Sequence, residues 1–266
     1  MSKATQAEEF RQILAGEHGG LKKMRVRMAR IPAGPRCKLC MAPFGSPGGT
    51  VLRHLGFGRF PGNPAICQNC ISGFTKPGMS GAGAEIPITL LFADVRGSTG
   101  LGERLSPTEF HAFLSRFYDI GSATILAHDG LVDKLVGDEI IGLFFGGVSG
   151  PGHAKVAIEA GVELLELAGR PDATTEGPIP LGAGVHTGIA YVGPSGPAGA
   201  VTDFTALGDV VNTTARLASS AGAGELLVTL DAATAADAPT AGVEHRILDV
   251  RGREATIETL VLRPAA

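Results

Sequence analysis

Two aspartates of this sequence lie at the ends of apolar segments, where a rigid strand would hold their carboxylates in fixed positions. Asp94 ends the apolar stretch ITLLFADV and precedes the turn RGSTG, whose backbone N–H groups suit phosphate oxygens. Asp138 follows Gly137 at the tip of a second apolar segment. Hard carboxylate oxygens on adjacent strand ends suit a pair of Mg²⁺ ions, with the remaining positions left to water and phosphates. Either aspartate alone is more often a turn former, so the residues by themselves only suggest a metal site.

The four cysteines of the chain form a second candidate site. They stand in two CxxC pairs, Cys37 with Cys40 and Cys67 with Cys70, separated by 26 residues. In a reducing compartment this pattern indicates a metal rather than disulfides. Structural Zn²⁺ is the favoured interpretation, and a cysteine-ligated Fe–S cluster stays open because it needs the same four thiolates. Neither pair is followed by the glycine usual in such knuckles, which keeps the cluster in consideration.

Alternating strands and helices from Pro87 onward must position the two aspartates. Strands are expected at 88–95, 131–136, 139–145 and 182–193, and helices at 106–127, 151–168 and 208–221. The tail from 224 alternates a strand, a short Ala-rich helix and two more strand-like segments. Because Gly137–Asp138 is a two-residue hairpin signal, the sheet is not purely parallel. The sequence therefore predicts an α/β (α+β) fold with a mixed, largely antiparallel sheet flanked by helices.

Helix 106–127 carries both a start signal and an apolar face. Ser106 is its expected N-cap, with Pro107 at the first helical position and Glu109 completing a capping box. Its apolar stripe is predicted to face the core and consists of Phe110, Phe113, Leu114, Phe117 and Ile120.

Charge divides the chain into two modules. Residues 1–76 hold 12 Lys and Arg against 3 Asp and Glu, net +9, whereas residues 77–266 hold 11 against 23, net −12. A basic module binds nucleic acid, anionic lipid or an acidic protein surface, or docks on its own acidic partner domain. The predicted domains are 1–76, the basic segment with the four cysteines; 77–85, a Gly-rich linker; and 86–262, which carries both aspartates.

The first thirty residues contain two short amphipathic segments. Residues 4–15 have helical spacing, and residues 21–31 mix five basic residues with apolar ones in a pattern that leaves helix and strand open. No apolar run approaches the roughly 18 residues of a membrane helix, and the start of the chain lacks the apolar core of a signal peptide. A cytoplasmic protein without a membrane span is expected.

Four ordered motifs resemble the catalytic domain of class III adenylyl and guanylyl cyclases. FADVRGST at 92–99 is similar to the first metal motif of the family, and DKLVGDEIIGLF at 133–144 is similar to the second. GVHTGIAYVG at 184–193 resembles the strand after the central helix, and DFTALGDVVNTTARLAS at 203–219 resembles the signature helix. The resemblance covers about residues 86–262 and implies a class III cyclase fold behind a small four-cysteine module.

The resemblance implies a role for each motif. Asp94 and Asp138 match the aspartates that hold two Mg²⁺ or Mn²⁺ ions per site, which activate the ribose 3′-hydroxyl and hold the triphosphate. Asn212 and Arg216 match the pair that orients the ribose and stabilises charge on the α-phosphate, and their i, i+4 spacing puts them on one helix face. The turn that cradles the terminal phosphates consists of Arg96, Gly97, Ser98 and Thr99.

The base-reading positions of the family are matched by Lys134 and Asp203. Adenine presents an acceptor at N1 and a donor at N6, which a lysine donor and an aspartate acceptor complement. Guanine presents the reverse, and each unpaired buried polar group costs about 1–3 kcal/mol. These two residues therefore predict ATP as the substrate.

The family divides its site between two subunits, with the metal aspartates on one and the base readers and the Asn/Arg pair on the other. All six positions are present, so a two-fold homodimer would hold two complete sites. The expected function is an adenylate cyclase regulated by the cysteine module. The alternative is a zinc-ribbon protein that binds nucleic acid or serves in signalling and uses the cyclase fold as a dimeriser. The complete set of site residues disfavours that alternative, and nucleic acid is not an expected partner.

Overall fold

A computed structural model describes residues 3–61, 63–75, 83–171, 177–195, 203–249 and 256–264. Two compact units make up the chain. One comprises Met1–Pro87, Phe145–Pro151 and Ile189–Gly208, and the other comprises Ile88–Phe144, Gly152–Gly188 and Asp209–Ala266. The first unit thus combines the N-terminal residues with two later segments, and the boundaries 1–76, 77–85 and 86–262 stay predictions. Most of the predicted linker lies outside the described residues, and Ala84 already begins a strand.

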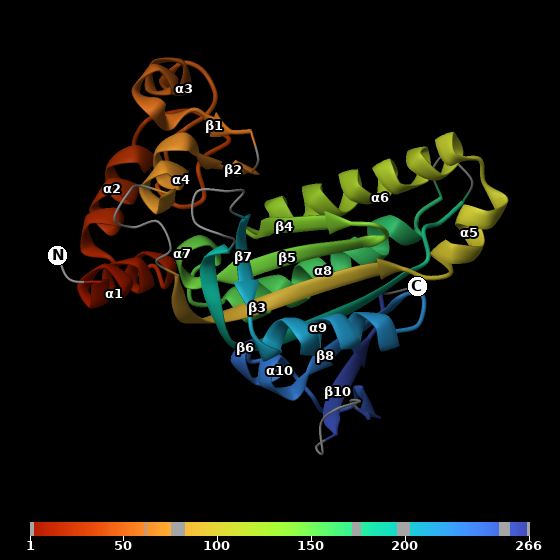
Figure 1. Ribbon diagram of the computed structural model, residues 1–266. Helices are drawn as coiled ribbons and strands as arrows, with labels where there is room; N and C mark the ends of the chain where they lie inside the picture. Colours follow the sequence, from red (N-terminus) through yellow and green to blue (C-terminus); the bar gives the residue numbers. More distant parts are fainter. Residues whose placement is uncertain are drawn as a thin grey trace. The chain divides into compact units, whose positions relative to one another are not determined.

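Eight strands of the described residues form one sheet in the order β4-β5-β3-β6-β8-β10-β9, with β7 paired to β6 (Figure 1). The β6–β8 pair is parallel, whereas the β4–β5, β6–β7, β8–β10 and β9–β10 pairs are antiparallel. The predicted mixed, largely antiparallel sheet is confirmed. The strands are β3 Ala84–Val95, β4 Leu131–Val136, β5 Glu139–Phe145, β6 Leu181–Ser195, β7 Asp203–Leu207, β8 Glu225–Thr229, β9 Glu244–Leu248 and β10 Ile257–Leu262.

Strand β3 lies inside the sheet, and every residue from Ile88 to Ala93 is buried. Such a run indicates a strand covered on both faces, which holds the residue at its end in a rigid position. Helices α6 and α8 pack against each other, and α8 and α9 each pack against β8. The helices of this part of the chain are α5 Ser98–Arg104, α6 Pro107–Ala127, α7 Gly146–Ser149, α8 His153–Gly169, α9 Asp209–Ser220 and α10 Leu230–Ala235.

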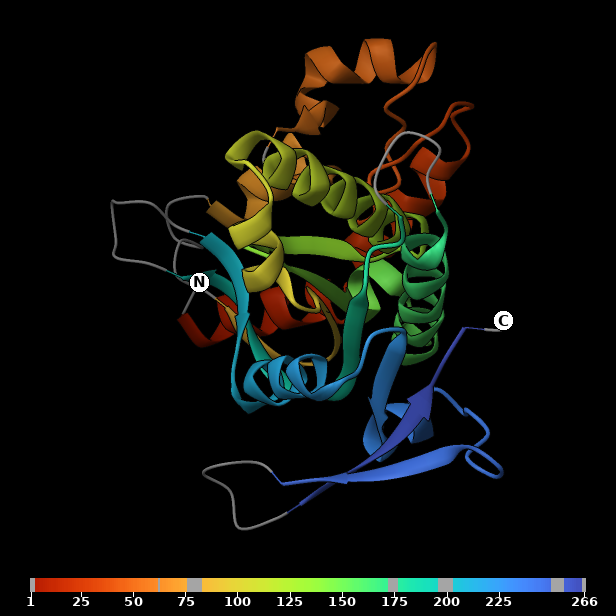
Figure 2. The same ribbon diagram turned by 90° about the vertical axis from the view of Figure 1, so that its right-hand side faces the viewer.

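Helix α6 begins as predicted, because Ser106 and Glu109 form the reciprocal capping box and Pro107 follows the cap. The predicted core stripe is only partly confirmed. Phe117 is fully buried in the core, whereas the other four stripe residues are half-buried. Figure 2 shows α6 and α5 in succession along one side of the sheet. A helix over the β4 end of a sheet has fewer neighbours to cover its apolar face, which accounts for the partial exposure.

The N-terminal residues fold into short elements around the four cysteines. Segment 21–31 was left open between helix and strand, and its residues 21–29 are helical in α2. His18 caps this helix by accepting from the backbone N–H of Leu21. The elements are α1 Lys3–Leu14, α2 Gly19–Ala29, α3 Gly48–Leu52, a π-helical turn Arg53–Phe57, β1 Arg59–Phe60, β2 Asn63–Cys67 and α4 Gln68–Thr75. No helix in the described residues is both long and apolar enough to cross a bilayer.

Helix α1 packs against α7, the short turn that follows β5. A side chain at Gly146 would meet the carbonyl oxygen of Ala15 at 2.4 Å, so only glycine permits this approach. Phe10 and Leu14 of α1 are fully buried. The first unit therefore joins the start of the chain to the segment directly after β5.

Candidate active site and metal centre

Asp94 and Asp138 are held by neighbouring strands of the sheet. Asp94 is the penultimate residue of β3, and Asp138 lies in the two-residue loop between β4 and β5. Gly137 opens this loop with φ 61°, the conformation that glycine favours at the first position of a tight hairpin. The backbone N–H of Val95 donates to the carbonyl of Asp138 at 3.0 Å. The predicted meeting of the two aspartates at adjacent strand ends thus occurs within one chain.

The turn after β3 contacts both carboxylates. The guanidinium of Arg96 forms an ion pair with Asp94, and the hydroxyl of Ser98 donates to Asp138. Arg96 also donates from Nη1 to the carbonyl of Ser219 at 2.9 Å, so its side chain is held by protein groups. Gly97 has φ 71° and lies at the start of α5. The turn predicted to cradle phosphates therefore also positions the two aspartates, while Thr99 is exposed.

The electrostatics of the site come from three carboxylates close together. Burial raises the pKa of Asp94, the Arg96 guanidinium opposes this rise, and the charge of Asp138 adds to it. Burial and the charges of both aspartates raise the pKa of Glu139 to about 7. Crowded oxygen ligands of this kind suit hard divalent cations, which relieve their mutual repulsion. The donor set therefore fits magnesium or manganese.

Two site residues were not singled out from the sequence. Glu139 is the third carboxylate of the site, and its position directly after Asp138 is the sequence feature that could have identified it. Tyr118 of α6 donates its hydroxyl to the carbonyl of Gly137, and burial together with the charge of Asp138 raises the pKa of this phenol. No local pattern links Tyr118 to the hairpin, because the contact depends on how α6 packs.

Asn212 and Arg216 lie on the exposed face of α9, opposite its buried residues. In the described part of the chain, neither side chain forms a hydrogen bond with Asp94 or Asp138. Arg216 lines a hollow of about 320 Å³ together with Leu248 and Ile257. Their predicted placement on one helix face agrees with the structure, and their catalytic roles stay predictions.

The two predicted base readers lie on different strands. Lys134 is half-buried in β4, pairs with Ile141 of β5 and follows a register shift in the hairpin. Asp203 begins β7, where its backbone pairs with Ser195. The side chain of Asp203 lies outside the described residues, so its part of the prediction is untested.

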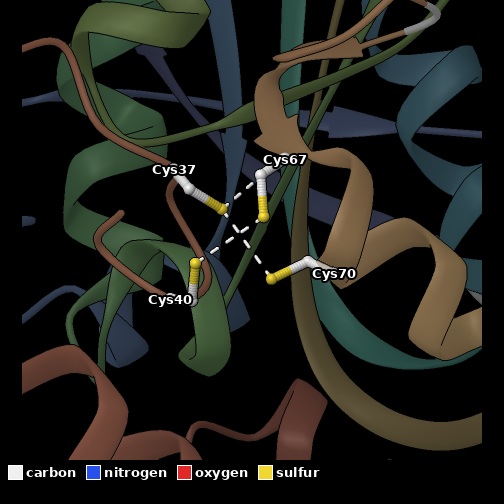
Figure 3. A group of neighbouring side chains, drawn as sticks. All are labelled: Cys37, Cys40, Cys67 and Cys70. Atoms are coloured by element: carbon white, nitrogen blue, oxygen red, sulfur yellow. Dashed lines mark hydrogen bonds between the residues drawn. The ribbon is translucent and has the colours of Figure 1, made fainter. Parts of the chain in front are cut away.

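The four cysteines lie together, with their sulfur atoms pointing toward one another (Figure 3). Cys37 and Cys40 come from the loop after α2, whereas Cys67 ends β2 and Cys70 lies in the first turn of α4. All four ligand atoms are within 4.8 Å of one another, and all four cysteines are free of disulfides. The predicted cluster is thus formed, and it fits a thiophilic metal.

The thiols of this cluster affect one another strongly. Hydrogen bonds with the other cysteines, above all Cys40, lower the pKa of Cys37. Hydrogen bonds with neighbouring cysteines, above all Cys37, raise the pKa values of Cys40 and Cys70. Four neighbouring thiols therefore do not all ionise by themselves. A bound cation would allow all four to act as thiolates.

A family model described as the adenylate and guanylate cyclase catalytic domain matches residues 83–263. The chain belongs to this cyclase family. The matched region contains Asp94, Asp138 and all of α9, in agreement with the four motifs. The four cysteines precede it.

Among curated proteins, Adenylate cyclase 1 of Rhizobium meliloti (strain 1021) is 33% identical over 136 residues, 49% of this chain and 20% of that protein. The adenylate cyclase of Anabaena cylindrica is 30% identical over 140 residues, 52% of this chain and 28% of that protein. The match thus covers less than a third of either relative's length.

Two solved cyclase structures are similar over most of their own length. The guanylyl cyclase Cya2 has a TM-score of 0.62 and 27% identity, covering 69% of this chain and 95% of that one. The adenylyl cyclase CyaB from P. aeruginosa has a TM-score of 0.59 and 25% identity, covering 68% of this chain and 96% of that one. The first is named a guanylyl cyclase and the second an adenylyl cyclase, so similarity of fold does not indicate whether this chain uses ATP or GTP.

Proposed function

We propose that this chain is an adenylate cyclase that converts ATP to 3′,5′-cyclic AMP and diphosphate at sites shared across a homodimer. The observation that carries the proposal is the meeting of Asp94 and Asp138 at adjacent strand ends, in a domain of the cyclase family. The adenylate cyclase names of the two curated relatives support it.

Asp94 and Asp138 are the residues that would hold two Mg²⁺ or Mn²⁺ ions. When bound, these ions would supply activation of the ribose 3′-hydroxyl and neutralisation of the triphosphate charge. The protein contributes rigidity, because β3 is buried and Ser98 holds Asp138 in place. The turn Arg96–Thr99 lies beside the carboxylates and offers its backbone to the terminal phosphates.

Asn212 and Arg216 would act on a substrate held by the other subunit. Both are exposed on α9, with Asn212 orienting the ribose and Arg216 stabilising charge that grows on the α-phosphate. Leu135 and Val136 of β4 are 45% and 55% exposed, which is consistent with a surface that a second copy covers. A monomer would be nearly inactive.

The choice of ATP over GTP rests on Lys134 and Asp203. Their hydrogen-bonding sense complements adenine, and the half-buried position of Lys134 makes an unpaired base edge costly. We further propose that the protein is cytoplasmic and that the four-cysteine module, with zinc or an Fe–S cluster, regulates the cyclase.

Mixing two inactive variants tests both the catalytic roles and the sharing of the site. Asp94→Ala and Arg216→Ala should each lower the rate of cyclic AMP formation at least about 10²-fold. Asp119→Ala removes an exposed carboxylate from α6 and should leave the rate unchanged. In an equal mixture of the two inactive variants, half of the dimers would be mixed, and each would hold one intact site. The mixture should therefore recover about a quarter of the wild-type rate.

Two results would contradict the proposal. Wild-type rates in the single variants would remove Asp94 and Arg216 from the mechanism. Inactive variants that fold, exchange subunits and show no recovery on mixing would place the whole site within one chain. Circular dichroism and size-exclusion chromatography of each variant supply the folding and assembly controls.

A further inference from the structure

The spacing of the four sulfur atoms distinguishes a single metal ion from a polynuclear cluster. Cys37 Sγ lies 3.9 Å from Cys70 Sγ, and Cys40 Sγ lies 3.7 Å from Cys67 Sγ. A tetrahedral Zn²⁺ ion with Zn–S bonds of about 2.3 Å places its ligands about 3.8 Å apart. The two measured separations therefore match the edges of a single-ion tetrahedron, with each pair joining one cysteine of each CxxC motif.

A polynuclear cluster requires a wider arrangement. Its thiolates bind different iron atoms, and bridging sulfides occupy the space between those atoms. Some sulfur–sulfur separations must then be much longer than the edge of a single-ion site. All four ligand atoms here are within 4.8 Å of one another, which leaves room for one ion at the centre.

Backbone contacts around the cluster hold this arrangement. The N–H of Cys67 donates to Cys37 Sγ at 3.3 Å, the kind of bond that stabilises a metal-bound thiolate. The N–H of Cys37 donates to Ala42 O at 2.8 Å, and Met41 adopts φ 64° where glycine is usual. The first CxxC pair thus forms a tight knuckle without glycine, so the missing glycine is no argument for iron.

One arginine connects this knuckle to the turn after β5. Arg25 Nη1 of α2 donates to the carbonyl oxygens of Lys38 and Leu39, at 2.9 and 3.0 Å, and to that of Gly147 at 3.0 Å. Lys38 and Leu39 are the two residues between Cys37 and Cys40. Gly147 belongs to α7, which directly follows β5, the strand that begins at Glu139 beside the candidate active site. The positions of the Lys38 and Leu39 carbonyls depend on the conformation of the knuckle, which a metal bound by Cys37 and Cys40 would hold closed.

We infer that the four cysteines bind a single zinc ion in a tetrahedral site, and that this ion, through Arg25, holds the Gly146–Ser149 turn in place. Four thiolates and Zn²⁺ carry a net charge of −2, which the +9 net charge of residues 1–76 compensates. The ion is structural, since all four positions are occupied by protein ligands and none is left for a substrate. Its loss would loosen the knuckle first and the turn second.

Metal analysis of the full chain tests the first part. Protein purified without oxygen should contain about one zinc per chain and no acid-labile sulfide, and it should be colourless. Cobalt exchanged for zinc should give the visible absorption of a tetrahedral thiolate site. Iron in place of zinc, with or without sulfide, would overturn the inference, as would a zinc content that is unchanged in Cys70→Ser. Cys70 is the half-buried ligand, and the wild-type analysis decides the matter even if this variant does not fold.

Hydrogen–deuterium exchange tests the connection through Arg25. Arg25→Ala should retain zinc while amide exchange of the 146–150 segment becomes about five-fold faster. Arg27→Ala is the matched control, because it removes an exposed arginine from the same helix, and it should leave this exchange unchanged. Removal of zinc from the wild-type chain should accelerate exchange in both the knuckle and the turn. A turn whose exchange is the same with and without zinc would refute the connection.

Discussion

Replacement of Glu225 by glutamine should lower the free energy of unfolding at neutral pH, and this effect should fade in acid. Glu225 begins β8, and its side chain is only 12% exposed. Its carboxylate accepts from Arg246 Nη1 at 2.7 Å, from Arg263 Nη2 at 2.6 Å and from the backbone N–H of Gly222 at 2.8 Å. Glutamine keeps the shape and an acceptor for Gly222, but it loses the charge that pairs with both arginines.

The pKa of Glu225 sets an upper limit on the loss. Hydrogen bonds from Arg246 lower this pKa from 4.5 to about 2, against the opposing effect of burial. Lowering the pKa from 4.5 to about 2 corresponds to a stabilisation of about 3.4 kcal/mol at most. The side chains of Arg246 and Arg263 are 30% and 49% exposed, so solvent screens the ion pairs. We therefore expect a loss of about 1–2 kcal/mol at pH 7.

The sign of the pH dependence follows from the lowered pKa. The unfolded chain binds a proton at Glu225 near pH 4.5, before the folded chain does. The stabilisation is therefore complete above about pH 4.5 and is lost as the pH falls toward 2. More than half of the difference between wild type and Glu225→Gln should be gone by about pH 3.

Urea unfolding followed by far-UV circular dichroism at several pH values measures this difference, since the chain has no tryptophan. Glu244→Gln is the matched control, because Glu244 contacts the same two arginines but is exposed. Its effect should be clearly smaller. Equal stability of wild type and Glu225→Gln at pH 7, or a difference that persists undiminished at pH 3, would refute the reasoning.

Two further predictions concern the base and the core. Lys134→Glu combined with Asp203→Cys should lower the ratio of ATP to GTP turnover at least about ten-fold, and an unchanged ratio in a cyclase assay would exclude these residues as base readers. Thr89→Val should cost about 1–3 kcal/mol, because the fully buried Thr89 hydroxyl lies 2.8 Å from His153 Nδ1 and 2.7 Å from Thr187 Oγ1. Urea unfolding checks this value, and a variant as stable as wild type would show that the two partners are satisfied elsewhere.

Local signals in the sequence were sufficient for many elements of the fold. The capping box of Ser106 and Glu109 marked the start of α6, and Gly137–Asp138 marked the β4–β5 hairpin. These signals act over a few residues, so they survive without knowledge of the tertiary structure. The four ordered motifs and the two CxxC pairs likewise indicated a cyclase domain and a metal cluster.

Contacts between distant segments were decided only by the tertiary structure. Arg96 reaches the carbonyl of Ser219, Tyr118 contacts the β4–β5 hairpin, and Arg25 joins the knuckle to Gly147. Each contact depends on how elements far apart in sequence pack, and periodicity carries no information on such packing.

The two candidate sites show the same division. The sequence determined that Asp94 and Asp138 end rigid segments and that four thiolates are available. Only the three-dimensional arrangement brought the carboxylates together and set the sulfur atoms 3.7 and 3.9 Å apart. The physical reason is that residue types determine which ligands are present, whereas the packed backbone determines the distances between them, and those distances determine how a metal can be bound.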